Sequence, residues 1–259
     1  MKDIKPYYFA LGKEEDVFTH AYQNKLPLLL KGPTGTGKSR FVEYMAYKLN
    51  KKLLTVSCHE ETSSTDLIGR FIIKGAETIW IDGPLTTALK EGSILYLDEI
   101  AEARPDVIVA IHSLTDHRRE LFIDKLGKTY KAHENFMIVA SFNPGYQRGF
   151  KELKPSTRQR FVALSFEYPK SKIETEIIAS ETGIDPNIAN KIVTIANKIR
   201  NLIELGLTET VSTRLLVDAA KLIHSGLPKR LSIHTAVVEP LTDDLQTVQS
   251  LKDLCDLMI

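Results

Sequence analysis

The chain has 259 residues, of which 43% are hydrophobic, so it can bury the core of one large or two modest domains. Its 34 basic and 33 acidic residues give a formal net charge of +1 and are interleaved, which indicates no nucleic-acid surface. The two cysteines, Cys58 and Cys255, stand without the paired Cys or His spacing of a zinc site, so we expect neither zinc nor a structural disulfide.

A glycine-rich loop follows the first apolar run. Residues 26–30 predict a strand and residues 40–49 a helix, and between them lies Lys31-Gly32-Pro33-Thr34-Gly35-Thr36-Gly37-Lys38-Ser39. Strand, loop and helix in this order are typical of a P-loop, whose glycines let backbone N–H groups approach phosphates closely. The positive end of the helix dipole also favours an anion there. We predict that Lys38 reaches the β- and γ-phosphates of a nucleotide and that the Ser39 hydroxyl is a ligand of Mg²⁺.

Two adjacent carboxylates end a later predicted strand. Residues 93–97 read as a buried strand, and Asp98 and Glu99 follow directly. An Asp-Glu pair alone is equally typical of a solvated turn, but after a P-loop it indicates a Walker B motif. We expect Asp98 to hold Mg²⁺ through its water shell. Glu99 would orient or deprotonate the attacking water.

A third apolar run, residues 136–142, ends at Asn143-Pro144. This placement resembles the sensor 1 position of AAA+ ATPases, where Asn143 would hold the lytic water or the γ-phosphate. An Asn before Pro is also typical of a simple turn.

The organisation of the chain changes near residues 168–169. Before that point apolar strands alternate with helical stretches, which predicts a three-layer α/β core with a parallel sheet over residues 1–168. After it, apolar residues recur at helical spacing over 188–202 and 215–223. Asp185 and Pro186 mark the start of the first of these helices. Residues 169–259 are therefore predicted to be a small helical domain.

Several longer strings resemble the CbbQ/NirQ/NorQ group of MoxR-type AAA+ ATPases over nearly the whole chain. The strings are 82–86 (Asp-Gly-Pro-Leu-Thr), 96–99 (Tyr-Leu-Asp-Glu), 114–119 (Leu-Thr-Asp-His-Arg-Arg), 143–147 (Asn-Pro-Gly-Tyr-Gln), 154–162 (Lys-Pro-Ser-Thr-Arg-Gln-Arg-Phe-Val) and 240–244 (Pro-Leu-Thr-Asp-Asp). Two of them, 82–86 and the Ser-Thr-Arg-Gln-Arg-Phe part of 154–162, are much narrower than the Walker motifs. The resemblance implies an AAA+ P-loop core with a C-terminal helical lid, and ATP with Mg²⁺ as the ligands.

The resemblance also implies roles for three arginines. Arg160 matches the arginine finger that completes the site of a neighbouring subunit, with Arg158 as a second candidate. A guanidinium suits this role because its planar fork pairs two phosphate oxygens and stays charged. Arg214 resembles sensor 2. With Ser212 as the predicted N-cap, Arg214 falls in the first turn of a helix, where a cation is unfavourable unless an anion lies nearby.

Two predicted hairpins match inserts of the same group. The runs 70–74 and 78–82 resemble the helix 2 insert, and the runs 121–123 and 129–131 resemble the hairpin before sensor 1. Phe71, Ile73 and Trp80 are candidates for contacting a target protein, although packing within the hairpin is an equally good explanation.

The function implied by the resemblance is an ATP-hydrolysing remodelling motor. It would be a homohexamer that acts with a von Willebrand factor A adaptor protein on a target enzyme, either rubisco or cytochrome-type nitric oxide reductase. The alternatives are a nucleotide-gated switch or scaffold with slow hydrolysis and, against the near-neutral charge, a nucleic-acid motor. No apolar run approaches the roughly 18 residues of a membrane span, and no signal peptide is evident. We therefore expect a cytoplasmic protein with no direct membrane insertion.

Overall fold

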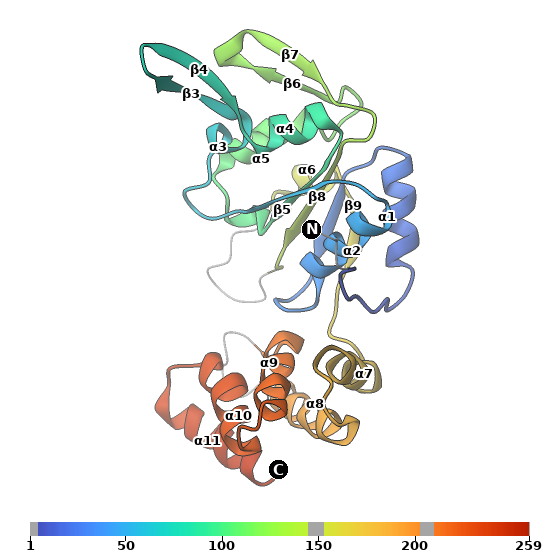
Figure 1. Ribbon diagram of the computed structural model, residues 1–259, viewed down its shortest axis with the longest axis vertical. Helices are drawn as coiled ribbons and strands as arrows, with labels where there is room; N and C mark the ends of the chain where they lie inside the picture. The colour runs from blue at the N-terminus through green and yellow to red at the C-terminus, as the bar shows by residue number, and fades with distance from the viewer. Residues whose placement is uncertain (1–4, 145–152, 203–209, 259) are drawn as a thin grey trace. The chain divides into compact units, whose positions relative to one another are not determined.

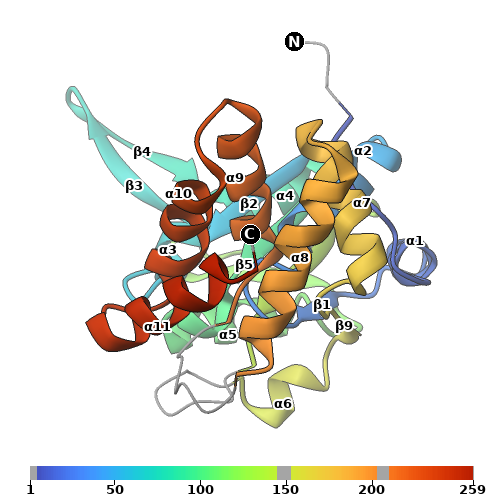
Figure 2. The same ribbon diagram turned by 90° about the horizontal axis from the view of Figure 1, so that it is seen from below.

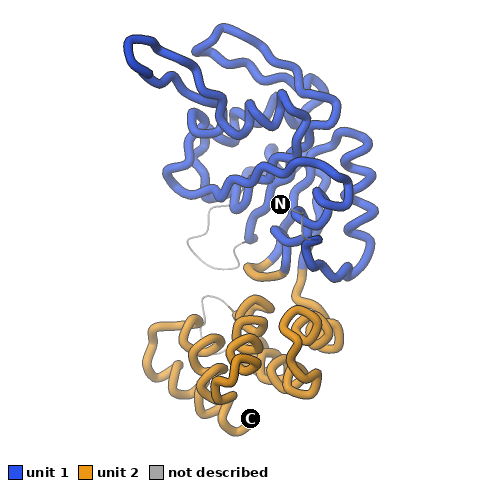
Figure 3. The backbone as a smooth tube through the Cα atoms, in the orientation of Figure 1, with its two compact units in different colours: residues 1–32, 37–166 blue, residues 33–36, 167–259 orange. Residues whose placement is uncertain are grey.

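The computed structural model describes residues 5–144, 153–202 and 210–258. The chain forms two compact units, residues 1–32 with 37–166 and residues 33–36 with 167–259 (Figure 3). The domain boundary proposed from the sequence, between 168 and 169, stays a prediction. Residues 145–147, which end one of the family strings, lie outside the described residues.

A five-stranded parallel sheet forms the centre of the first unit (Figure 1). Its spatial order is β2-β5-β8-β1-β9, so β8 lies between the strand before the glycine-rich loop and the strand that ends at Asp98. The strands are β1 (Leu28–Lys31), β2 (Leu53–Ser57), β5 (Ile94–Asp98), β8 (Met137–Phe142) and β9 (Val162–Ser165).

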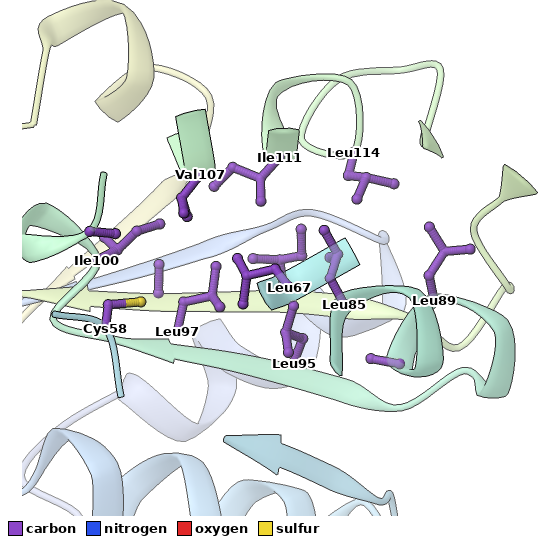
Figure 4. Close-up of a cluster of buried hydrophobic side chains, with 14 of the residues drawn as sticks. Cys58, Leu67, Leu85, Leu89, Leu95, Leu97, Ile100, Val107, Ile111 and Leu114 are labelled. Carbon is purple, nitrogen blue, oxygen red and sulfur yellow. The ribbon is translucent and has the colours of Figure 1, made fainter. Parts of the chain in front are cut away.

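Helices cover both faces of this sheet because its central strands are apolar on both sides. Along β1, Leu28 and Leu30 lie in one buried cluster and Leu29 lies in the other. The first face packs on α1 (Glu14–Gln23) and α2 (Lys38–Lys48). The second packs on α3 (Ser64–Ile68), α4 (Pro84–Glu91) and α5 (Pro105–His112), whose apolar side chains Figure 4 shows over β5. The predicted three-layer α/β fold is confirmed.

Both predicted hairpins form, and both contact α4. They consist of β3 (Gly69–Lys74) with β4 (Glu77–Asp82), and of β6 (Glu120–Ile123) with β7 (Lys128–Lys131). Lys90 of α4 joins the two hairpins: its Nζ lies 2.6 Å from a carboxylate oxygen of Asp82 and 4.4 Å from the ring centre of Tyr130. The short helix α6 (Pro155–Arg158) precedes β9.

The second unit is helical, as predicted. Its helices are α7 (Ser171–Thr182), α8 (Pro186–Arg200), α9 (Thr213–His224), α10 (Lys229–Ile233) and α11 (Leu245–Asp256), with one π-helical turn at His234–Val238. Figure 2 shows α7, α8 and α9 as neighbours, and each pair of them is in contact. Asp185 caps α8 and Ser212 caps α9, which confirms both predicted helix starts.

Within the described residues, no helix is both long and apolar enough to cross a membrane. Both cysteines are free and buried, Cys58 with 4% of its surface exposed and Cys255 with none. Burial, reinforced by the carboxylate of Asp256, raises the pKa of Cys255 to about 11. At pH 8 this thiol is therefore protonated as well as inaccessible, and only a thiolate is a good nucleophile.

We predict that the native protein reacts slowly with Ellman's reagent at pH 8 and that denaturation in guanidinium chloride releases both of its thiols for rapid reaction. The measurement is the absorbance of the released thiolate over time. Rapid reaction of either thiol in the native protein would contradict this placement of the cysteines.

Candidate nucleotide-binding site

The carboxyl ends of β5, β8 and β1 meet at one edge of the sheet because the three strands are parallel neighbours. The glycine-rich loop leaves β1 there, Asp98 ends β5, and Asn143 follows β8. In an open α/β sheet this edge is where ligands bind. The fold thus brings together three segments that the sequence analysis selected separately.

The glycine-rich loop adopts a backbone that favours glycine. Gly37 has a φ of 91° and directly precedes α2, which begins at Lys38 without a side-chain cap. Gly35 has a φ of 72°, and an added Cβ there would lie 2.5 Å from the Cβ of Ser212. Within the loop, Thr36 Oγ1 donates to the Pro33 carbonyl over 2.9 Å. An uncapped helix start after such a loop suits an anion.

Lys38 is almost fully buried at this helix start, with 7% of its surface exposed. Its Nζ donates to the Gly32 carbonyl and to Asn143 Oδ1, both over 2.8 Å. The P-loop lysine and the predicted sensor asparagine are therefore in direct contact across β1 and β8. A buried ammonium group beside a helix N-terminus concentrates positive charge where the predicted phosphates would lie.

Ser39 and Asp98 form the second half of the site. Ser39 Oγ donates to Asp98 Oδ2 over 3.0 Å, and the Tyr96 hydroxyl donates to Asp98 Oδ1 over 2.7 Å. The Ser39 and Tyr96 oxygens are 3.2 Å apart. A serine hydroxyl beside a carboxylate offers the oxygen ligands that Mg²⁺ prefers, so these residues fit the implied metal.

Glu99 has an exposed side chain and a backbone φ of 56°, which is uncommon for a residue other than glycine. Ser141 of β8 supports this conformation. Its Oγ accepts the Glu99 backbone N–H over 3.1 Å and donates to Asp98 Oδ1. Strained backbone persists where surrounding contacts determine it and is frequent at functional sites. Ser141 thus holds both Walker B carboxylate residues in place.

Ser141 and Tyr96 were not selected from the sequence. Both are almost fully buried, yet each places a hydroxyl on Asp98. The available signal was a hydroxyl-bearing residue among apolar ones in each strand, Tyr96 just before the end of β5 at Asp98 and Ser141 near the end of β8. A buried hydroxyl needs a partner, and at the carboxyl end of a strand the nearest partners are the groups of the site.

The two finger candidates have different surroundings. The Arg158 side chain is exposed at the end of α6 and makes no hydrogen bond or ion pair with the residues that the structure describes. Arg160 donates to the His112 carbonyl over 3.3 Å and lies 3.8 Å from Asp116 Oδ2. Hydrogen bonds from Arg118 hold the pKa of Asp116 at about 2, so this carboxylate stays charged beside Arg160.

Arg214 lies in the first turn of α9, as predicted. Its Cβ is 3.6 Å from the position that a Cβ on Gly35 would occupy, so the arginine begins next to the glycine-rich loop. No acidic residue occupies the first turn of α9. The sensor 2 role of Arg214 stays a prediction.

Comparisons with known proteins show the family of the chain. A family model described as an AAA domain of the dynein-related subfamily matches residues 27–161, and a model described as CbbQ/NirQ/NorQ C-terminal matches residues 174–258. Protein CbbQ of Hydrogenophilus thermoluteolus is 52% identical over 93% of this chain and 90% of that protein. Protein NorQ of Paracoccus denitrificans is 53% identical over 96% and 92%. The denitrification regulatory protein NirQ of Pseudomonas aeruginosa is 49% identical over the full length of both.

Among solved structures, an A156S mutant of RuvB from Thermotoga maritima superposes with a TM-score of 0.56. It covers 93% of this chain and 67% of its own, at 18% identity, so the likeness concerns the fold alone. The fold and the site together define an AAA+ domain of the P-loop class followed by a helical unit. The chain belongs to the CbbQ/NirQ/NorQ group of MoxR-type AAA+ ATPases.

We predict that Ser141→Ala lowers the thermal unfolding midpoint more than Ser93→Ala does. Ser141→Ala leaves the Glu99 N–H without its partner and removes one of the two hydroxyl groups that donate to Asp98 Oδ1, at a cost of about 1–3 kcal/mol, or roughly 2–10 °C for a unit of this size. Ser93 is the matched control, since it is equally buried but precedes β5 at the opposite end. Equal shifts in calorimetry would show that the Ser141 hydrogen bonds contribute nothing.

Proposed function

We propose that the chain is a Mg²⁺-dependent ATPase that acts as a remodelling motor on another enzyme. The observation that carries the proposal is the convergence of Lys38 with Asn143 and of Ser39 with Asp98 at one sheet edge, beside the exposed carboxylate of Glu99. This is a site that binds phosphates on one side and orients a water molecule on the other. Phosphoryl transfer needs little more than such positioning and charge stabilisation.

Each residue has a distinct role in this proposal. Residues 32–38 bind the phosphates, with the Lys38 ammonium on the β- and γ-phosphates. Ser39 and Asp98 would hold Mg²⁺, whose charge would offset that of the phosphate oxygens. Glu99 orients or deprotonates the attacking water. Asn143, which contacts Lys38 in this structure, would exchange that contact for the γ-phosphate or the water.

The arginine finger is proposed to come from a neighbouring subunit of a homohexamer. The sequence favoured Arg160, whereas the surroundings support Arg158. A finger must reach a neighbouring subunit's nucleotide, and Arg158 is exposed at the end of α6, while Arg160 already contacts Asp116 and the His112 carbonyl in its own subunit. Arg160 can serve only if it leaves these contacts. Arg214 is proposed as sensor 2.

The partners come from the family. We propose a von Willebrand factor A adaptor protein on a separate chain and a target that is either rubisco or cytochrome-type nitric oxide reductase. Identity does not separate these targets, because the chain is as similar to the protein named CbbQ as to the one named NorQ. The β3–β4 hairpin is proposed to contact the target, since Ile73 at its tip is 81% exposed whereas Phe71 and Trp80 pack on each other. The motor would act in the cytoplasm.

We predict that Glu99→Gln lowers kcat for ATP by at least about 100-fold while ATP still binds, because the amide cannot accept the proton of the attacking water. Glu91→Gln, which alters an exposed glutamate of α4, is the control and should turn over at the wild-type rate. Phosphate release and equilibrium binding of ATP measure the two effects. The motor proposal fails if the wild type binds ATP but its rate of hydrolysis is negligible or is the same in Glu99→Gln. The alternative that then remains is a nucleotide-gated switch.

We further predict that Arg158→Ala lowers turnover by about a thousandfold or more, as removal of an arginine finger does, whereas Arg230→Ala on α10 leaves it unchanged. Mixing Arg158→Ala with Glu99→Gln should restore activity, because a site with an intact Glu99 then meets the intact Arg158 of a neighbour. Wild-type turnover per subunit should rise with protein concentration. Activity lost in Arg160→Ala but retained in Arg158→Ala would reverse the assignment of the finger.

A further inference from the structure

A fully buried carboxylate lies inside the helical unit and has no role in the assignments above. Glu174 of α7 has no exposed surface. Arg200 of α8 binds it with two parallel hydrogen bonds, Nη1 to Oε2 and Nη2 to Oε1, both 2.8 Å long. Thr213 Oγ1 donates to Glu174 Oε1 over 2.6 Å. Both Glu174 oxygens thus have hydrogen-bond donors, as a buried carboxylate requires, and removing either charge of the pair would leave the other buried and unpaired.

The same arginine contacts the chain just before α9. Arg200 Nε donates to the Val211 carbonyl over 2.8 Å, and Glu174, its partner in the ion pair, accepts a hydrogen bond from the Thr213 hydroxyl. Val211 and Thr213 flank Ser212, the N-cap of α9, and Arg214 follows. The ion pair thus holds the backbone carbonyl before the N-cap and the Thr213 side chain after it, and Thr213 directly precedes Arg214.

The guanidinium group of Arg200 also lies over an aromatic ring. The central carbon of Arg200 lies 4.4 Å from the ring centre of Tyr168, at cation–π distance. The Tyr168 hydroxyl in turn donates to the carbonyl of Thr34 in the glycine-rich loop over 3.0 Å. Next to Thr34, Gly35 approaches Ser212 so closely that no side chain fits between them. Two consecutive loop residues therefore contact groups that Arg200 holds. Residues 33–36 are grouped with the helical unit in Figure 3.

We propose that Tyr168 and Arg200, anchored by Glu174, are positioning residues that couple the conformation of the nucleotide-binding loop to the first turn of α9. The proposal rests on the proposed binding of ATP by residues 32–39. Nucleotide binding at the loop then favours one position of Arg214, and by reciprocity the position of Arg214 changes nucleotide affinity. Tyr168 acts through other residues and touches no reacting atom.

The test is a double-mutant cycle read by equilibrium binding of a fluorescent ATP analogue. Tyr168→Phe removes the hydrogen bond to the loop but keeps the ring on Arg200, so the fold is preserved. We expect the variant to bind the analogue about 3- to 10-fold more weakly, with an unchanged unfolding midpoint. In an Arg214→Ala background the same substitution should change binding by less than about twofold, because the group that it positions is absent. Tyr47→Phe, which alters an exposed tyrosine of α2, is the control.

Arg200→Lys gives a second, independent measurement. Lysine keeps the charge opposite Glu174 but loses the planar fork and the stacking on Tyr168. We expect nucleotide binding by the folded protein to weaken as in Tyr168→Phe. A purely structural ion pair would lower the unfolding midpoint and leave binding by the folded protein unchanged.

The outcomes separate this proposal from the proposed function. If the wild type binds the analogue and Tyr168→Phe binds it equally well, or if the effects of Tyr168→Phe and Arg214→Ala simply add, the coupling proposal is overturned and the ATPase proposal is untouched. If the wild type binds without hydrolysing ATP, the motor proposal fails, and the binding cycle still decides the coupling. If the wild type does not bind the analogue, both fail.

Discussion

The hydrogen bond from Ser39 to Asp98, 3.0 Å long, joins residues that are 59 positions apart. It can form only because parallel neighbouring strands end at the same sheet edge, with β8 between β1 and β5. The same constraint brings Asn143 to Lys38 and Ser141 to Asp98. Apolar side chains on both faces of these strands bury the sheet between helices, and that burial fixes the edge on which the polar groups meet.

β8 contributes more to this arrangement than its sequence indicates. Ser141 binds both residues of the Walker B pair, and Asn143, two positions later, binds the P-loop lysine. One strand therefore positions the groups expected to hold the metal, orient the water and contact the phosphates. A small shift of β8 would alter all three, which is a physical reason for a sensor residue to follow this strand.

Motifs and elements were predictable from the sequence where their signals are local. The glycine-rich loop, the Walker B carboxylates, both hairpins and the N-caps of α8 and α9 each depend on residues within a few positions of one another. Ser141 and the pair of Glu174 with Arg200 were missed because their partners lie 43 and 26 positions away. The different surroundings of Arg158 and Arg160 could not be predicted from the sequence either, because Asp116 and His112 are distant from Arg160 along the chain and meet it only in the folded structure.

Under the proposed function, the choice of target would depend on residues outside the nucleotide-binding site. The relatives named CbbQ and NorQ are 52% and 53% identical to this chain, so overall identity does not separate them. The exposed apolar residues of the β3–β4 hairpin are the proposed target contact. Ile73 is 81% exposed and Phe71 46%, and burying such side chains favours a protein contact. Lys90 of α4 contacts both hairpins, so a proposed target that displaced one hairpin would also affect the position of the other through Lys90.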